Sequence, residues 1–336
     1  MGHALNGIDA SLFVRVANVV ASWHRPVLLT HARPDGDAVG CLVALRSILR
    51  ANGARPRALL FEPPPARYAW LLKGEPIAVL QRRDHQALDE ADGVIVLDTG
   101  AYGQLQPVES WLRQTGLPKV VLDHHVTRDV QTEHYLIDES ASAACLILED
   151  WARAASWKLD EQARVALYVG MATDTGWFRF ANTDARTLEA AAGLVREGVC
   201  PATVFEQVYQ QESSARFRLL AAALGTVELH AADRLAVMTV TRDLLARTGA
   251  DAADTEDLIN YPLQIADVQA SVLLAEHEDN VVRISLRSKP PSGTRPDLDV
   301  AAVAATFGGG GHRRAAGARV SGALADIKRL VIERMT

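Results

Sequence analysis

A chain of 336 residues is longer than one average domain, so its length predicts two compact units, each with its own core. A composition of 49% hydrophobic and 23% charged residues excludes a disordered or fibrous chain, and a net charge of -6 argues against a protein that grips long duplex nucleic acid. Three widely spaced cysteines exclude a disulfide framework and a zinc ribbon, and the lack of a signal pattern or of an apolar run of roughly 20 residues predicts a cytoplasmic protein without membrane attachment.

The first part of the chain alternates helical and strand-like segments. Apolar residues recur at helical spacing over residues 8–23, and a polar loop at 31–40 separates a short strand at 27–29 from a helix at 41–50. Further short aliphatic runs predict buried strands at residues 58–61, 93–97 and 119–122. This alternation predicts a mostly parallel α/β sheet flanked by helices.

The pattern becomes helical after the last of these strands and then changes character. Helices are predicted at residues 141–157, 161–172 and 184–198. Later strand-like stretches lie at 235–240, 269–276 and 280–286, with helices near 297–307 and 323–335. The sequence therefore predicts an N-terminal domain over residues 1–198, a connecting helix over 199–225 and a smaller C-terminal α+β domain over 226–336.

Polar residues follow three of the predicted strands. The first strand precedes His31, Asp35 and Asp37, the second ends at Asp98, and the third is followed by Asp123, His124 and His125. Each of these residues alone is typical of a turn or a helix cap. Because the carboxyl ends of parallel strands meet at one edge of a sheet, together they predict one site. Asp174 ends a helical segment and by itself would be a helix cap or a turn residue. It is assigned to the site because of the other polar residues.

The predicted site offers carboxylates and imidazoles but no thiolate. Such ligands suit Mn²⁺ best, with Mg²⁺ and Co²⁺ as alternatives and Zn²⁺ less favoured. Several carboxylates crowded together would repel one another, and two divalent cations would remove that repulsion. The residues therefore predict a site for two Mn²⁺ ions that activates a water for attack on phosphorus.

Five motifs of the chain resemble those of the DHH/DHHA1 phosphoesterases, especially small bacterial members that degrade nanoRNA and dephosphorylate phosphoadenosine phosphate. They are HARPDGDAVG at 31–40, VLDTG at 96–100, DHH at 123–125, ATDTGWF at 172–178 and GGGGHRRAAG at 308–317. The resemblance spans nearly the whole chain. It implies an N-terminal DHH domain, a C-terminal DHHA1 domain, an active site in the cleft between them and a homodimer.

The resemblance also implies a role for each site residue. His31, Asp35 and Asp98 would hold one metal, and Asp37, Asp98, His124 and Asp174 would hold the other, with Asp98 as the bridge. Asp123 would orient His124, and His125 would point at the scissile phosphate, with a packing role as the alternative. Gln104 departs from the pattern, because many relatives have an arginine there.

The four glycines at 308–311 exceed what a helix C-cap at Gly308 requires. Glycine backbone N–H groups can form an anion-binding nest, which His312 and Arg313 would supplement. The resemblance implies that Gly309, Gly310, Gly311, His312 and Arg287 bind the phosphate and sugar end of the substrate. Arg313 could also bind the phosphate, and the alternative is that it is a solvated surface charge.

The leading hypothesis for function is hydrolysis of short single-stranded RNA or DNA oligonucleotides to 5'-mononucleotides, with removal of the 3'-phosphate from 3',5'-bisphosphate nucleotides such as phosphoadenosine phosphate. A cyclic or linear dinucleotide phosphodiesterase, acting on cyclic di-AMP or pApA, would need the same metal site and phosphate nest. An inorganic pyrophosphatase or exopolyphosphatase is a further alternative that the glycine motif disfavours. A non-enzymatic nucleotide sensor is disfavoured because every expected ligand is present.

Overall fold

The computed structural model describes residues 7–80, 88–278, 280–292 and 297–336. The chain divides into two compact units, Met1–Gln211 and Glu212–Thr336, and each is described by itself. Within the described residues, no helix combines the length and the apolar character that a membrane crossing requires.

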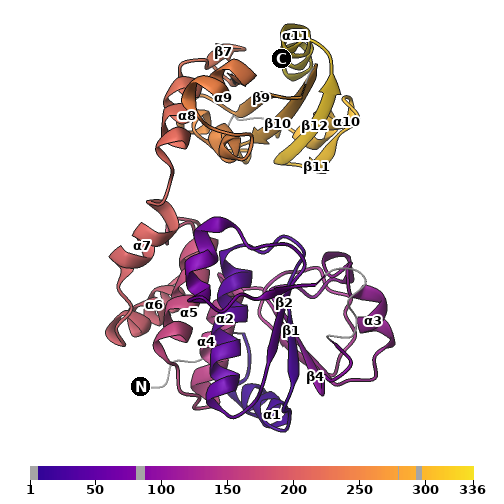
Figure 1. Ribbon diagram of the computed structural model, residues 1–336, viewed down its shortest axis with the longest axis vertical. Helices are drawn as coiled ribbons and strands as arrows, with labels where there is room; N and C mark the ends of the chain where they lie inside the picture. The colour runs from indigo at the N-terminus through magenta and orange to yellow at the C-terminus, as the bar shows by residue number, and fades with distance from the viewer. Residues whose placement is uncertain (1–6, 81–87, 279, 293–296) are drawn as a thin grey trace. The chain divides into compact units, whose positions relative to one another are not determined.

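The first unit is built on a six-stranded parallel sheet, which confirms the predicted α/β class (Figure 1). Its strand order is β3-β2-β1-β4-β5-β6. The strands are β1 (Pro26–Leu29), β2 (Arg57–Leu60), β3 (Ala78–Val79), β4 (Gly93–Leu97), β5 (Lys119–Asp123) and β6 (His134–Ile137). Residues of the central strands alternate between two separate cores, so both faces of the sheet are covered and the strand sequences are continuously apolar.

Helices cover both faces of this sheet. One core joins the strands to α1, α2, α4 and α5, and the other joins them to α3. The helices of the first unit are α1 (Ala10–Val20), α2 (Gly36–Ala51), α3 (Glu109–Gln114), α4 (Ala144–Ala154), α5 (Glu161–Asp174), α6 (Ala185–Arg196) and α7 (Pro201–Tyr209), with 3₁₀ turns η1 (Ala66–Leu72) and η3 (Tyr102–Gln104).

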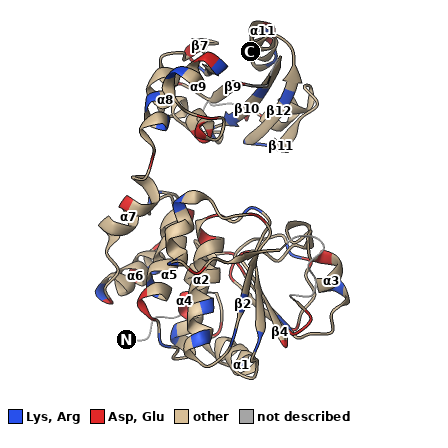
Figure 2. Ribbon diagram, viewed as in Figure 1, with Lys and Arg blue, Asp and Glu red and all other residues tan. Residues whose placement is uncertain are grey.

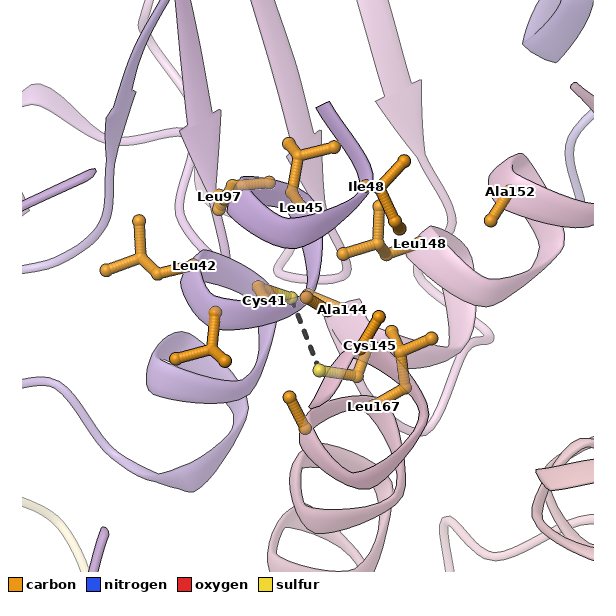
Figure 3. Close-up of a cluster of buried hydrophobic side chains, with 14 of the residues drawn as sticks. Cys41, Leu42, Leu45, Ile48, Leu97, Ala144, Cys145, Leu148, Ala152 and Leu167 are labelled. Carbon is orange, nitrogen blue, oxygen red and sulfur yellow. Dashed lines mark hydrogen bonds between the residues drawn. The ribbon is translucent and has the colours of Figure 1, made fainter. Parts of the chain in front are cut away.

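Two glycines, Gly40 of α2 and Gly170 of α5, allow α2, α4 and α5 to pack closely. A Cβ atom on Gly40 would lie 2.6 Å from the carbonyl oxygen of Ala166, and one on Gly170 would lie 2.2 Å from the Sγ of Cys145. Figure 3 shows that Cys41 of α2 and Cys145 of α4 face each other in this interior, with their Sγ atoms 3.5 Å apart. The close packing buries nearly all of α2 and fixes the loop that precedes it.

The second unit contains a six-stranded mixed sheet of order β11-β12-β10-β9-β8-β7, in which only β8 and β9 pair in parallel among the described strands. Its strands are β7 (Glu228–His230), β8 (Leu235–Val240), β9 (Ala270–Glu278), β10 (Val281–Ser288), β11 (Gly310–His312) and β12 (Ala315–Ser321). Its helices are α8 (Ser214–Leu224), α9 (Arg242–Thr248), α10 (Val300–Ala305) and α11 (Leu324–Met335), with 3₁₀ turns η4 (Ala253–Thr255), η5 (Leu258–Asn260) and η6 (Pro262–Gln264). One core includes α10 and α11 and the other includes α8 and α9, as expected for an α+β unit.

Two local predictions differ from the structure. The single connecting helix is wrong: α7 ends at Tyr209, and the side chain of Ser213 caps a separate helix, α8. The second concerns the glycine run, for which the sequence predicts a nest: Gly310 to His312 instead form the edge strand β11, which pairs with β12 in a hairpin. Glycine-rich sequence has low strand propensity, so only pairing with β12 makes this segment a strand.

Candidate metal centre

The ends of three parallel strands and of one helix supply the polar residues predicted from the sequence. His31 follows β1, Asp98 follows β4 directly, Asp123 ends β5 and Asp174 ends α5. Asp35 is the N-cap of α2, where its Oδ1 accepts the backbone N–H groups of Asp37 and Ala38 at 3.0 and 3.1 Å. The helix cap thus holds one predicted ligand in place and starts the helix that carries the next.

Asp98 lies between two histidines. Its Oδ2 is 3.4 Å from the Nε2 of His31, and its Oδ1 is 3.5 Å from the Nε2 of His124. His31 Nε2 also lies 3.9 Å from Asp35 Oδ1, and His124 Nε2 lies 3.7 Å from Asp174 Oδ2. Asp98 therefore presents one oxygen to each of two neighbouring clusters.

The six residues predicted as metal ligands form two adjoining groups. In one, ligand atoms of His31, Asp35 and Asp98 all lie within 4.8 Å of one another, and in the other the same holds for Asp37, His124 and Asp174. A divalent cation with ligand distances of about 2.0 to 2.6 Å fits between atoms at this spacing. Oxygen and imidazole donors of this kind suit Mn²⁺, Mg²⁺ or Co²⁺.

Asp98 has two features that favour a cation at this place. Its side chain is only 2% exposed, yet its Oδ1 accepts no hydrogen bond within the described part of the chain, since the approach of His124 lacks hydrogen-bond geometry. Its φ of 58° lies in the left-handed region, which aspartate and asparagine adopt more readily than most residues other than glycine. An unsatisfied buried carboxylate oxygen in an uncommon backbone conformation is typical of a functional site.

Asp37 is anchored by a helix other than its own. Its Oδ2 accepts the backbone N–H of Ala144 at 2.5 Å, and its Oδ1 accepts that of Cys145 at 2.9 Å. These donors belong to the first turn of α4, whose own N-cap residue, Ala143, has no side chain that can accept a hydrogen bond. Asp37 therefore caps α4 from α2, and the positive end of the α4 dipole stabilises its negative charge.

The two histidines of the DHH motif are oriented by different partners. His124 Nδ1 lies 3.1 Å from the carbonyl oxygen of Ala141, so Nδ1 donates and Nε2 faces the carboxylates. Asp123 Oδ1 lies 2.7 Å from His125 Nδ1 and also accepts the His125 backbone N–H at 3.1 Å. The expectation that Asp123 orients His124 is therefore wrong. The side chain of His125 is 56% exposed, which leaves its Nε2 accessible.

The charges of the site oppose one another in the absence of a cation. Burial, and next the Asp98 carboxylate, raise the pKa of Asp35 and Asp37. The pKa of Asp174 is raised to about 6, mainly by burial and also by Asp98, although His124 lowers it. Burial lowers the pKa of His124, but Asp98 and Asp37 outweigh this and raise it to about 10. A bound divalent cation would relieve the repulsion among these crowded carboxylates, which raises their pKa values.

The buried thiols of Cys41 and Cys145 lie next to this site, and ligand atoms of both lie within 4.8 Å of an Asp37 oxygen. Burial raises the pKa of Cys41 to about 12 and that of Cys145 well above its usual value. Both therefore stay protonated and pack as small apolar groups, which agrees with the metal site predicted without thiolates.

The predicted phosphate-binding residues lie in the second unit, on β10 and the β11–β12 hairpin, where basic residues are frequent (Figure 2). Gly309 and Gly311 are required by packing, because a Cβ atom would lie 2.1 Å from the Gly317 carbonyl oxygen and 2.5 Å from that of Ala315, respectively. Gly310 is different: a Cβ atom there would meet nothing within 4 Å. Its lack of a side chain leaves open space beside an edge strand.

The charged members of that group have different surroundings. Arg313 donates from Nε to Asp297 at 3.0 Å and from Nη1 to Asp299 at 3.1 Å, so its charge is compensated. His312 is exposed, and Arg287 is half-buried on β10 opposite Ala315. In place of the nest predicted from four glycines, the structure has the exposed edge of strand β11, which ends at His312.

Two groups that support the ligands were not predicted from the sequence, the side chain of Asn182 and the backbone carbonyl of Ala141. Asn182 Nδ2 donates to the carbonyl oxygens of Ser142 and Asp174, at 3.2 and 3.3 Å. The Ala141 carbonyl acts through its backbone, which no residue type reveals. Only Asn182, eight positions after Asp174, lies near enough to a motif to have been a candidate.

Comparisons with known proteins identify the family of the chain. The DHH family N-terminal domain matches residues 26–171, and the DHHA1 domain matches residues 233–336. The bifunctional oligoribonuclease and PAP phosphatase NrnA of Thermus thermophilus is 30% identical over 316 residues, which cover 91% of this chain and 88% of that protein. The protein of the same name from Bacillus subtilis is 27% identical, with 88% of each chain covered.

Solved structures show the same fold. An exopolyphosphatase-related protein from Bacteroides fragilis superposes with a TM-score of 0.85 at 21% identity and covers 98% of both chains. A manganese-bound RecJ exonuclease has a TM-score of 0.52 at 15% identity, covering 98% of this chain and 94% of that one. Fold, motifs and relatives lead to one conclusion: the chain belongs to the DHH/DHHA1 family of metal-dependent phosphoesterases.

Proposed function

We propose that this protein hydrolyses phosphodiester bonds in short oligonucleotides, releasing 5'-mononucleotides, and removes the 3'-phosphate from phosphoadenosine phosphate. The observation that carries the proposal is the position of Asp98, with one oxygen toward His31 and the other toward His124. The names of the relatives from Thermus thermophilus and Bacillus subtilis support both activities.

In this proposal His31, Asp35 and Asp98 hold one Mn²⁺, and Asp37, Asp98, His124 and Asp174 hold the other. Bound together, two such cations supply a water of lowered pKa and neutralise charge on the phosphate oxygens. The chain's own contribution is to hold six side chains in place. Asp35 does so as the cap of α2, and Asp37 does so through two N–H groups of α4.

His125 has the role of a hydrogen-bond or proton donor to the substrate phosphate. Asp123 fixes its Nδ1, so the free Nε2 is the nitrogen available to a ligand. The hydrogen bond to Asp123 also raises the pKa of His125, which favours the protonated, donating form. The pair resembles an acid–histidine dyad in which the carboxylate fixes tautomer and direction.

The DHHA1 unit contributes binding of the phosphate and sugar end. The edge of β11 offers backbone donors, Gly310 leaves room for close approach, and His312 and Arg287 lie on or near this hairpin. Arg313 has no place in this proposal, because Asp297 and Asp299 already bind its guanidinium. Nucleotide specificity therefore rests on the second unit and phosphoester chemistry on the first.

One activity matrix tests the proposal. The purified protein is incubated with di- to pentanucleotides, pApA, cyclic di-AMP, phosphoadenosine phosphate and pyrophosphate, each with Mn²⁺, Mg²⁺ or Co²⁺, and products are separated by ion-exchange chromatography. We expect mononucleotides from the short oligomers and AMP from phosphoadenosine phosphate. Preference for cyclic di-AMP would favour the dinucleotide phosphodiesterase alternative. The cyclic-di-AMP phosphodiesterase GdpP of Geobacillus thermodenitrificans is 26% identical to this chain, over 90% of this chain and 46% of the length of GdpP. Cleavage of pyrophosphate alone would contradict the proposal.

A further inference from the structure

One loop contacts two of the six proposed ligands directly and a third through Asn182. Residues 138–145 run from the end of β6 into the first turn of α4, and we call them the support loop. Its Ala141 carbonyl oxygen is 3.1 Å from His124 Nδ1, and its Ala144 and Cys145 N–H groups bind both oxygens of Asp37. Its Ser142 carbonyl shares Asn182 Nδ2 with the carbonyl of Asp174.

These three ligands, Asp37, His124 and Asp174, are the members of one ligand group. Within the ranges that the structure describes, no hydrogen bond joins the support loop to His31 or Asp35. Asp35 is instead held by the N–H groups of α2. The two proposed metal positions therefore have separate mechanical supports.

The support loop is itself held by a buried ion pair. Asp138 accepts Ser140 N and Oγ at 3.0 and 2.6 Å with its Oδ1, and its Oδ2 accepts Arg186 Nη1 at 2.5 Å. Arg186, from the first turn of α6, also donates its Nε to Asp150 of α4 at 3.0 Å. The side chains of Arg186, Asp138 and Asp150 are 17%, 3% and 10% exposed, so water screens these charges poorly.

We propose that Arg186 and Asn182 are positioning residues for one metal position, the one formed by Asp37, His124 and Asp174. This inference rests on the proposed two-metal function. Without the arginine, two buried carboxylates of like charge would face each other, at Asp138 and at Asp150, and the loop between β6 and α4 would shift. The Ala141 carbonyl would then no longer fix the His124 ring, and the α4 N–H groups would no longer fix Asp37.

The test measures metal binding on the full chain, without reference to turnover. Manganese titrations of metal-free wild type, Arg186→Met and Asn182→Ala are followed by calorimetry, and low-temperature EPR separates a spin-coupled manganese pair from isolated ions. We expect one of the two affinities to fall by about 10- to 100-fold in Arg186→Met, and by less in Asn182→Ala, with the other affinity unchanged. EPR at two equivalents should show isolated Mn²⁺ in place of the coupled pair.

Arg153→Met is the matched control. Arg153 also binds two carboxylates, Glu149 at 2.7 Å and Glu197 at 2.6 Å, but neither belongs to the support loop. We expect both affinities to be retained in this control. Equal losses at both positions, or none in either test variant, would overturn the inference. Asn182 is exposed, so its variant decides the matter if Arg186→Met does not fold. A wild type that binds a single ion would instead refute the proposed two-metal function.

Discussion

Asp37 accepts the backbone N–H of Cys145, a residue 108 positions away in the chain, at 2.9 Å. With the companion bond from Ala144, this contact lets a proposed metal ligand cap the N-terminus of α4, whose own N-cap residue Ala143 makes no side-chain hydrogen bond. The Asp37 carboxylate is thus both a proposed metal ligand and the cap of α4. A substitution that keeps the capping oxygen but removes the negative charge distinguishes these two roles.

We expect Asp37→Asn to destabilise the metal-free protein less than Asp37→Ala does, because the amide oxygen still accepts one of the two α4 N–H groups, while its NH2 group faces the other. Asp37→Ala should lose about 1 to 2 kcal/mol, the usual cost of a lost cap. Urea denaturation in the presence of EDTA measures both, and Mn²⁺ titration should show weakened binding in both. Equal stability of the alanine and asparagine variants would show that the cap is unimportant.

Asp98 should be indispensable for turnover. Asp98→Asn retains shape and tolerates the left-handed φ of 58°, so we expect a folded protein whose hydrolysis of pApA falls below detection. Circular dichroism serves as the control for folding. Retained hydrolysis in this variant would refute the assignment of Asp98 as the bridge.

Measurements of kcat and of Mn²⁺ affinity distinguish whether Asp123 supports His125 or His124. Because Asp123 holds His125, we expect Asp123→Asn to reproduce the defect of His125→Ala, a fall in kcat of about 100-fold, with little change in Mn²⁺ affinity. The double variant should be no worse than either single one, since the two residues act as a unit. A loss of Mn²⁺ affinity in Asp123→Asn would mean that Asp123 supports His124 after all.

The metal-free protein should lose stability as pH rises. The folded-state pKa of Asp174 is raised to about 6, above the unfolded value of about 3.9, so the folded state binds more protons between these limits. Stability therefore falls from about pH 4 to pH 6. Melting temperatures with EDTA should show this slope, Asp174→Asn should reduce it, and saturating Mn²⁺ should reverse it. A slope unchanged in Asp174→Asn would assign the effect to other groups.

The three glycines of the β11 hairpin should respond differently to alanine. Gly309→Ala and Gly311→Ala should destabilise the second unit, because each new Cβ atom would clash with β12. Gly310→Ala should leave the melting temperature unchanged and raise KM for oligonucleotides, because it fills space open to the substrate. An unaltered KM in Gly310→Ala would remove this glycine from the binding site.

The structure confirms the α/β class of the first unit and brings together the six residues that the sequence singled out as ligands. Local patterns suffice for this because short apolar runs predict the strands, and the carboxyl ends of parallel strands share one edge. His31, Asp98 and Asp123 follow or end such runs, so their convergence needs no knowledge of side-chain packing.

The tertiary structure alone decided which groups hold these residues. The pairing of Asp123 with His125, the bond from His124 to a backbone carbonyl and the capping of α4 by Asp37 depend on distances between segments that local periodicity does not encode. The run GGGGH predicts an anion-binding nest from its glycines, and it becomes a strand because β12 lies beside it. The sequence by itself determined the chemistry of the centre, and long-range packing determined its orientation and support.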